Sequence, residues 1–294
     1  MKKIKNHITL VIIFLLLNSC DDSKLFSLES DSSGVIFENK LEYTEEFNPY
    51  TYRNFYNGGG VALGDINNDG LIDIYLTGNI VENKMFLNKG NFQFEDITEV
   101  SGLACPNVWS TGATFADING DGLLDLYVCK SGDPEGENRH NELFINNGDL
   151  TFSEESKKYN LDILGLSVHA AFFDYDKDGD LDCYILNNSI RSIGGYDLIE
   201  DQREIADPEG QGNKLLENRD GKFVDVTQSA GIYSSKIGFG LGITLSDYNN
   251  DGWTDLFISN DFFEKDYLYV NNKDGTFSEE SENFFQSLSL GSMG

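Results

Sequence analysis

Four short loops rich in oxygen-bearing side chains recur along the chain, and their residue types favour the binding of a cation. The loops begin at Asp65, Asp117, Asp174 and Asp247. Counted from that first Asp, oxygen-bearing side chains occupy positions 1, 3, 5 and 9 of every loop, and glycine occupies position 6. A loop of this kind can wrap its oxygens around a hard cation, because glycine adopts the backbone angles that a sharp turn needs.

The side chains at positions 1, 3, 5 and 9, with the backbone carbonyl at position 7, are the expected calcium ligands. They are Asp65, Asn67, Asp69, Leu71 and Asp73; Asp117, Asn119, Asp121, Leu123 and Asp125; Asp174, Asp176, Asp178, Asp180 and Asp182; and Asp247, Asn249, Asp251, Trp253 and Asp255. Runs of Asp, Asn and Gly also form ordinary turns, but the recurrence of Asp at positions 1, 5 and 9 favours calcium. Magnesium is disfavoured because it keeps its waters and requires stricter octahedral geometry. We expect about four calcium ions, and since extracellular calcium is millimolar, we expect them to be structural.

The third loop differs from the others in its charge. Asp176 stands at position 3, where the other loops have Asn, so this loop should bind calcium most tightly. We expect Asp180, at position 7, to contribute its carbonyl and to point its side chain away from the ion.

The segments around each loop have the composition of β-strands. Runs of small and apolar residues precede the loops, as at 58–64, and β-formers follow them, as at 74–76. Near-continuous apolar strands suit burial on both faces, and glycines suit strands that crowd around an axis. A second hairpin with an Asn-Gly or Asp-Gly turn completes each unit, as at 85–94. Strands flanking the loops exclude a helical EF-hand.

Four antiparallel strands in a repeat of about fifty residues form one blade of a β-propeller. The predicted fold is all-β, an incomplete ring of about four blades with partial strands at its ends. The expected repeats are 50–103, 104–161, 162–232 and 233–285, with a partial fifth at 286–294. Residues 26–37 are expected to form the final strand of a preceding blade, because Phe26 and Gly34 have the spacing of Phe94 and Gly102. We therefore expect the chain to be part of a longer protein.

The charge of the chain limits its partners. It has 21 Lys and Arg against 50 Asp and Glu, a net charge of −29. Such a surface repels nucleic acids and anionic membranes, so we expect no nucleic-acid partner.

The first residues are typical of an export signal. Lys2, Lys3 and Lys5 precede an apolar run at 8–17 that is too short to span a bilayer. Residues 17–20, Leu-Asn-Ser-Cys, resemble a bacterial lipobox, so we expect a lipoprotein signal peptide at 1–19, lipidation of Cys20 and a short tether at 20–25. The alternative is an ordinary secretory peptide with an incidental cysteine. We expect secretion across the inner membrane and anchoring to the outer membrane at the cell surface, with the leaflet left open.

Three further cysteines, Cys105, Cys129 and Cys183, lack metal-type spacing. Buried thiols are the default interpretation, and a Cys105–Cys129 disulfide stays open.

The repeats resemble the FG-GAP/VCBS family, which shares the propeller of integrin α-subunits, and the resemblance covers about 26–294. Segments 55–65 and 88–98 more closely resemble bacterial surface lipoproteins related to cartilage acidic protein, which often end in an ASPIC/UnbV module that is absent here. The resemblance implies calcium in each loop. For most bacterial members it implies no settled activity.

These features favour a non-catalytic, calcium-binding surface protein for adhesion or for recognition of a protein or glycan. The candidate ligand face is opposite the loops and comprises Trp109 with Arg191, Tyr196 and Arg203 from an insert at 187–212, although that insert is equally consistent with a solvated loop. His169 replaces a glycine of the other repeats near the axis, where a lone histidine more often belongs to the core or lines a channel than acts as a catalyst. The alternative function is the propeller domain of a secreted carbohydrate-active or other hydrolytic enzyme.

Overall fold

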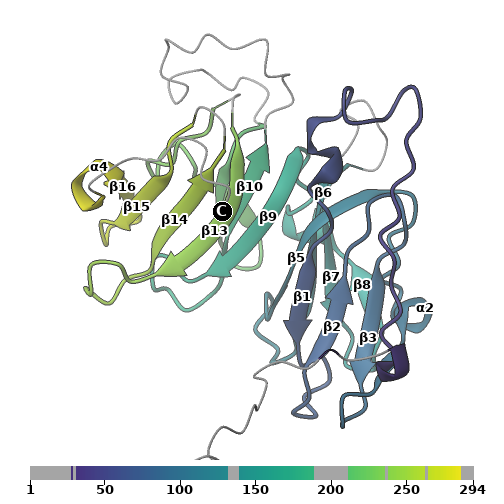
Figure 1. The fold of residues 1–294 in the computed structure, drawn as a ribbon. Coiled ribbons are helices and arrows are strands. Elements are labelled where there is room, and N and C mark those ends of the chain that lie inside the picture. The colour runs from purple at the N-terminus through teal and green to yellow at the C-terminus, as the bar shows by residue number, and fades with distance from the viewer. Residues whose placement is uncertain are drawn as a thin grey trace, which may run out of the picture. The chain divides into compact units, whose positions relative to one another are not determined.

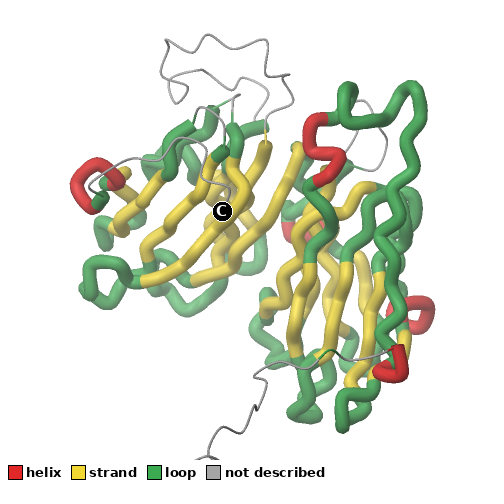
Figure 2. The backbone as a smooth tube through the Cα atoms, viewed as in Figure 1, coloured by secondary structure: helices red, strands yellow, loops and turns green. Residues whose placement is uncertain are grey.

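The computed structural model describes residues 28, 31–131, 139–188, 211–235, 238–261 and 264–285. Gly34–Gly294 form the compact unit that holds every described strand, and Met1–Ser33 cluster separately. Four antiparallel sheets of four strands each make up the larger unit (Figures 1 and 2). The predicted all-β, blade-like architecture is confirmed. In the described part of the chain, no helix has the length and apolar character needed to cross a membrane.

Each sheet is a meander in sequence order. Blade 1 has β1 (Val61–Gly64), β2 (Asp73–Leu76), β3 (Lys84–Asn88) and β4 (Phe94–Asp96). Blade 2 has β5 (Trp109–Ala116), β6 (Asp125–Ser131), β7 (Glu142–Asn146) and β8 (Phe152–Glu154). Blade 3 has β9 (Leu166–Phe173), β10 (Asp182–Asn188), β11 (Lys214–Asn218) and β12 (Phe223–Asp225). Blade 4 has β13 (Gly240–Ser246), β14 (Asp255–Asn260), β15 (Tyr267–Asn271) and β16 (Phe277–Glu279).

The helical elements are single turns. Helices α2 (Thr98–Ser101), α3 (Ser156–Tyr159) and α4 (Ser281–Phe284) follow the last strands of blades 1, 2 and 4. The 3₁₀ turns are η1 (Asp31–Ser33) and η2 (Arg53–Tyr56).

The hydrophobic core lies between neighbouring blades. Tyr75 and Met85 of blade 1 pack with Leu126 and Val128 of blade 2 in one buried cluster. Equivalent clusters join blade 2 to blade 3 and blade 3 to blade 4. The second strands are therefore covered on both faces, and every residue of β6 and β10 is buried. This explains why the sequence of these strands lacks polar alternation.

The first strands of the blades approach one another at glycines. A Cβ atom added to Gly60 would lie 3.0 Å from the Cα of Gly112, and one added to Gly112 would lie 2.9 Å from the Cα of His169. Only residues without a side chain allow this approach. The expected crowding of first strands is thus observed.

A polar side chain closes the connector between the second and third strands of every blade. It accepts a hydrogen bond from the backbone N–H near the end of the second strand. The pairs are Asn83 with Gly78, Asn141 with Lys130, Asn213 with Asn187 and Asp266 with Asn260, at 2.8, 2.8, 3.0 and 2.7 Å. Because the two ends of the connector are joined directly, its length can vary from blade to blade.

The end of each repeat contacts the next blade through a residue with positive φ. A Cβ atom on Gly231 would lie 2.7 Å from the carbonyl oxygen of Phe277, and one on Gly34 would lie 2.2 Å from that of Phe94. Gly34 therefore lies against blade 1 as Gly231 lies against blade 4. The described part of the expected strand at 26–37 is not a strand, and this part of the prediction is wrong. Residues 31–33 form a 3₁₀ turn, and residues 34–37 have no strand pairing. A helical turn followed by a residue with positive φ, here Gly34, ends this segment, as α2 and Gly102 end repeat 1.

We predict that Gly34→Ala destabilises the protein more than Gly275→Ala does. Both glycines have positive φ, 87° and 83°, but a Cβ on Gly275 has no atom within 4 Å. The control should cost about 1 kcal/mol from backbone strain, and Gly34→Ala about 1–3 kcal/mol more from overpacking. Denaturant unfolding measures both values, and equal losses would show that Gly34 does not contact blade 1.

Candidate functional site

The Asp at position 9 of each loop is a buried brace. Asp73, Asp125, Asp182 and Asp255 are at most 1% exposed. Each carboxylate accepts one backbone N–H from its own loop and one from the last residue of the third strand. The donors are Ile66 and Asn88 to Asp73 (3.0 and 2.7 Å), Ile118 and Asn146 to Asp125 (3.0 and 2.9 Å), Tyr175 and Asn218 to Asp182 (3.1 and 2.9 Å), and Tyr248 and Asn271 to Asp255 (2.9 and 2.8 Å). Position 9 thus joins the loop to the third strand, while each oxygen keeps a lone pair for a cation.

Burial makes three of these carboxylates harder to ionise. Desolvation raises the pKa of Asp125 to about 6 and that of Asp182 to about 7, although the two N–H bonds act in the opposite direction. The pKa of Asp73 is also raised, again chiefly by burial. A cation beside these groups would favour their charged form.

Loops 1, 2 and 4 are closed by hydrogen bonds among their own expected ligands. The position-3 amides of Asn67, Asn119 and Asn249 donate to the position-5 carboxylates at 3.0, 2.9 and 2.8 Å. In loop 1 the carboxylate of Asp65 accepts the backbone N–H groups of Asp69 and Gly70 at 3.1 and 2.7 Å. These loops can hold their shape through hydrogen bonds alone.

Loop 3 brings carboxylates together without an amide between them. Ligand oxygens of Asp174, Asp176 and Asp182 all lie within 4.8 Å of one another, and no other such acidic, histidine or cysteine group occurs in the described residues. The Oδ1 atom of Asp174 is buried without a hydrogen-bond partner. Three converging carboxylates and an unpaired buried oxygen fit a hard cation.

Asp180 adds a fourth carboxylate to this region. Its Oδ1 atom is also buried without a hydrogen-bond partner. Desolvation, and then repulsion from Asp178, Asp176 and Asp174, raises the pKa of Asp180 to about 6. The side chain of Asp180 is therefore a candidate ligand, in addition to its carbonyl.

Two asparagines missed by sequence reasoning connect the loops of neighbouring blades. Asn146 of blade 2 donates to the Ile66 carbonyl of loop 1 at 2.8 Å. Asn271 of blade 4 donates to the Tyr175 carbonyl of loop 3, also at 2.8 Å. The sequence shows these residues as hairpin-turn formers, and only the packing of blades reveals their second role.

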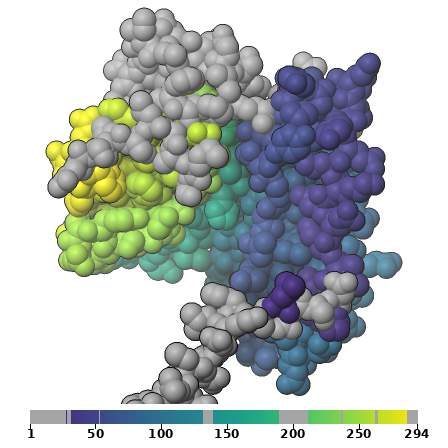
Figure 3. All heavy atoms as spheres, viewed as in Figure 1, coloured from purple at the N-terminus to yellow at the C-terminus, as the bar shows by residue number. Residues whose placement is uncertain are grey.

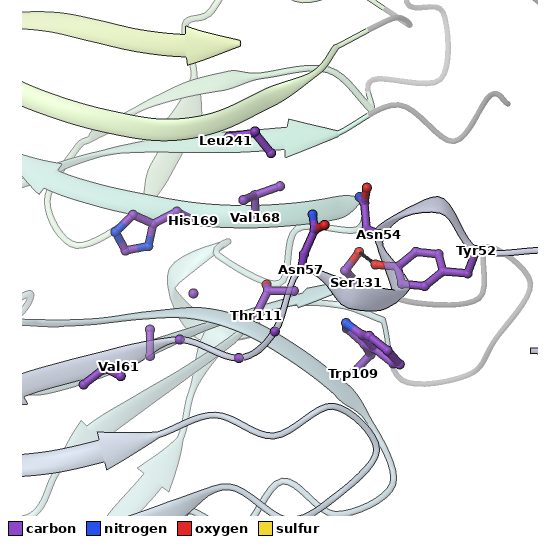
Figure 4. Close-up of a pocket in the computed structure, with 15 residues that line it drawn as sticks. Tyr52, Asn54, Asn57, Val61, Trp109, Thr111, Ser131, Val168, His169 and Leu241 are labelled. Carbon is purple, nitrogen blue, oxygen red and sulfur yellow. Dashed lines mark hydrogen bonds between the residues drawn. The ribbon is translucent and has the colours of Figure 1, made fainter. Parts of the chain in front are cut away.

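A pocket of about 270 Å³ lies at the other end of the blades from the loops. Strands β1, β5, β9 and β13 begin near it and end at the loops (Figures 1 and 4). Its lining includes Tyr52, Asn54 and Asn57 from the segment before β1, and His169 from β9. Tyr52 and Ser131 hydrogen-bond to each other at 2.6 Å on one wall. The sequence signal for this pocket was the run of aromatic and Asn residues at 47–57.

The described lining residues include no acidic or strongly basic side chain. His169 is the one imidazole among them, and burial lowers its pKa, which favours the neutral form. The Nδ1 atom of His169 and the Nε1 atom of Trp109 are both buried without hydrogen-bond partners. The pocket thus offers neutral polar groups to a ligand.

Trp109 is buried instead of standing on an open ligand face. It is 3% exposed, and its ring centroid lies 5.2–5.4 Å from those of Phe47, Tyr52 and Phe55. The segment before β1 supplies these three rings, which cover the indole. Arg191, Tyr196 and Arg203 lie outside the described residues, as do the signal peptide and Cys20.

The three internal cysteines are free and buried, as the default interpretation expected. The Cys105–Cys129 disulfide is not formed. The Cys105 thiol instead donates to Glu142 at 3.3 Å, and Glu142 pairs with the buried Lys130 at 2.7 Å.

Comparison with known proteins identifies the repeat. The FG-GAP-like repeat model matches residues 65–128 and 247–294. Cartilage acidic protein 1 of Xenopus tropicalis is 29% identical over 230 residues, which cover 78% of this chain and 32% of the relative. Cartilage acidic protein 1 of Mus musculus is 28% identical over 204 residues, which cover 69% of this chain and 28% of that relative. The chain therefore spans about a third of the length of these curated relatives.

Two solved structures show a distant similarity to this chain. One is an Agrocybe aegerita lectin described for its recognition of non-reducing terminal N-acetylglucosamine, with 17% identity, a TM-score of 0.41 and coverage of 78% of this chain and 51% of the lectin. The other is the Tc holotoxin pore of Photorhabdus luminescens, with 17% identity, a TM-score of 0.31 and coverage of 75% and 9%.

The described residues thus form four blade-like sheets, two stretches of the chain match the FG-GAP-like repeat, and the chain is similar to cartilage acidic protein 1.

Proposed function

We propose that this chain is a calcium-braced recognition module, which binds a protein or glycan ligand outside the cell and performs no catalysis. The observation that carries this proposal is the division of the blades into two ends. Acidic loops occupy one end, and a pocket whose described lining is uncharged lies at the other. The first strand of each blade links the two, because β9 begins beside the pocket at Leu166 and ends at Phe173, directly before loop 3.

Calcium is supported most directly by loop 3. Without a cation, Asp174, Asp176 and Asp182 repel one another at close range. A bound ion would remove that repulsion and hold the end of β9 against β10. In loops 1, 2 and 4 the ion would displace the amide donor of the Asn, which then presents its oxygen.

The pocket supports recognition rather than hydrolysis. Hydrolysis of a glycosidic bond ordinarily uses two carboxyl groups as acid and base or nucleophile. The described lining holds no carboxylate, and its one titratable side chain near neutrality is His169. An enzymatic role would require turnover that disappears in His169→Ala.

Location at the cell envelope rests on the N-terminal sequence, with its basic residues, apolar run and Cys20. A lipid at Cys20 would tether the module to the outer membrane. The net charge of −29 disfavours nucleic acid as a partner.

We predict that Asp176→Asn weakens one calcium site. The substitution gives loop 3 the amide of the other loops, so one of four sites should lose about tenfold in affinity, or about 1.4 kcal/mol. Calorimetric titration of metal-depleted protein measures this, with Asp149→Asn as a matched control, because Asp149 is an exposed residue between β7 and β8 and is no expected ligand. Wild-type protein without heat of binding would contradict the calcium proposal.

Calcium should also raise the melting temperature of the whole protein. Ligand at 100 times Kd stabilises by about 2.7 kcal/mol per site, and each kcal/mol corresponds to about 2–4 °C in a domain of this size. A shift of several degrees in scanning fluorimetry is expected, and Asp176→Asn should reduce it. A melting temperature that is unchanged by millimolar calcium would contradict the structural role of the ion.

The stability of the metal-depleted protein should fall as pH rises from 5 to 8. Asp125, Asp180 and Asp182 have pKa values raised to about 6, 6 and 7, whereas the unfolded value is about 3.9. Between these values the folded state holds protons that the unfolded state has released, so the free energy of unfolding decreases with pH. Saturating calcium should flatten this dependence. Melting curves at both pH values, with and without calcium, test it, and a metal-free protein that is equally stable at pH 5 and 8 would contradict it.

A further inference from the structure

Two buried nitrogen atoms point to a ligand in the pocket. Trp109 and His169 line it, and the Trp109 Nε1 and His169 Nδ1 atoms are buried without hydrogen-bond partners (Figure 4). A buried polar group without a partner costs about 1–3 kcal/mol, so unsatisfied groups of this kind call for an explanation. The indole N–H can only donate, and therefore requires an acceptor. A ligand hydroxyl can accept from Trp109 and either donate to or accept from His169.

The other described lining residues carry no charge and combine amides with aliphatic groups. Asn54 and Asn57 offer both donors and acceptors, while Val61, Val168 and Leu241 offer apolar surface. A charged ligand would lack a counter-charge here, which makes its desolvation costly. Sugar rings combine hydroxyls that donate and accept with C–H faces that contact aliphatic side chains. The volume of about 270 Å³ suits one such ring.

The segment before β1, which supplies one wall of the pocket, also carries exposed tyrosines. Tyr43, Tyr50 and Tyr56 are 65%, 100% and 66% exposed. Tyr43 and Tyr56 pack on the buried Phe55 with centroid distances of 5.8 and 5.4 Å, and Phe55 in turn packs on Trp109. The purple segment that carries them lies on the surface along blade 1 (Figure 3). Exposed tyrosines with a rigid support are typical of recognition surfaces.

We propose that the pocket binds one uncharged sugar residue of a glycan, with Trp109 and His169 hydrogen-bonding its hydroxyls and the three tyrosines contacting the neighbouring sugars. This inference rests on the proposed recognition role and names its ligand class. Binding is expected to be of millimolar Kd for a single sugar, about −4 kcal/mol, and tighter for an oligosaccharide.

The indole N–H of Trp109 provides a direct readout. The chain has two tryptophans, so ¹⁵N-labelled protein gives two indole signals, which Trp109→Phe assigns. Neutral methyl glycosides of glucose, galactose, mannose and N-acetylglucosamine should be titrated to about 50 mM, well above a millimolar Kd. At least one should shift the Trp109 signal saturably downfield, because its N–H gains an acceptor. The Trp253 signal, from loop 4, should stay in place.

Matched variants separate the pocket from the fold. His169→Gly restores the glycine found at the equivalent position in the other blades and should weaken binding at least tenfold. Tyr50→Ala should leave monosaccharide binding unchanged and weaken a trisaccharide of the same sugar several-fold. Asn68→Ala, on the loop end, should change neither. A cooperative melting transition, measured without calcium, reports whether each variant is folded.

Several results would overturn the inference. The first is a Trp109 signal that no neutral glycoside shifts, and the second is binding of glucuronate or glucosamine as tight as that of the neutral glycosides. The third is a glycoside-induced shift that persists in His169→Gly. The fourth is a Trp109 shift caused by N-acetyl-dialanine amide instead of by sugars. If the glycosides fail but the protein still binds envelope proteins, the glycan inference falls and the recognition role stands. If a glycoside binds while calcium leaves the melting temperature unchanged, the pocket proposal stands and the calcium brace falls.

Discussion

A buried carboxylate with two backbone donors is the interaction on which each blade depends. The Asp at position 9 ties the first hairpin to the third strand, so it fixes where the loop leaves the sheet. Its burial carries an electrostatic cost, which two N–H bonds reduce and a cation would reduce further. Replacing any of these four residues by an apolar one would leave two buried N–H groups without partners. The repeated Asp is therefore required by the fold before it is required by an ion.

The two ends of the blades carry different physical constraints. At the loop end, charge density is high and the backbone is held by many short-range hydrogen bonds. At the pocket end, the first strands of neighbouring blades approach one another at glycines. His169 occupies the equivalent position in blade 3, where the other three blades have glycine. Gly112 makes room for it, since a Cβ there would lie 2.5 Å from Nδ1. The rigid glycine-rich centre thus allows a single side chain to become part of a pocket wall.

The fold was predictable because its signals are local. Loop positions, Asn-Gly turns and apolar runs each lie within ten residues, and their repetition removed ambiguity. The pocket was not predictable in the same way. Its lining combines segments from Tyr52 to Leu241, and the burial of Trp109 depends on rings that lie more than fifty residues away in the sequence. Spacing could place His169 near the axis, but only packing reveals that its Nδ1 lacks a partner.

The hydrogen bonds of Asn146 and Asn271 have a consequence for how the chain divides into folding units. Each reaches a loop carbonyl in the preceding blade, so a loop is completed by residues from the next repeat. A single repeat cut out at its sequence boundaries would lose these contacts and the core that it shares with its neighbour. The sequence repeat therefore does not coincide with a unit that has its own complete core and loop contacts. A blade is therefore stable only when it packs against a neighbouring blade.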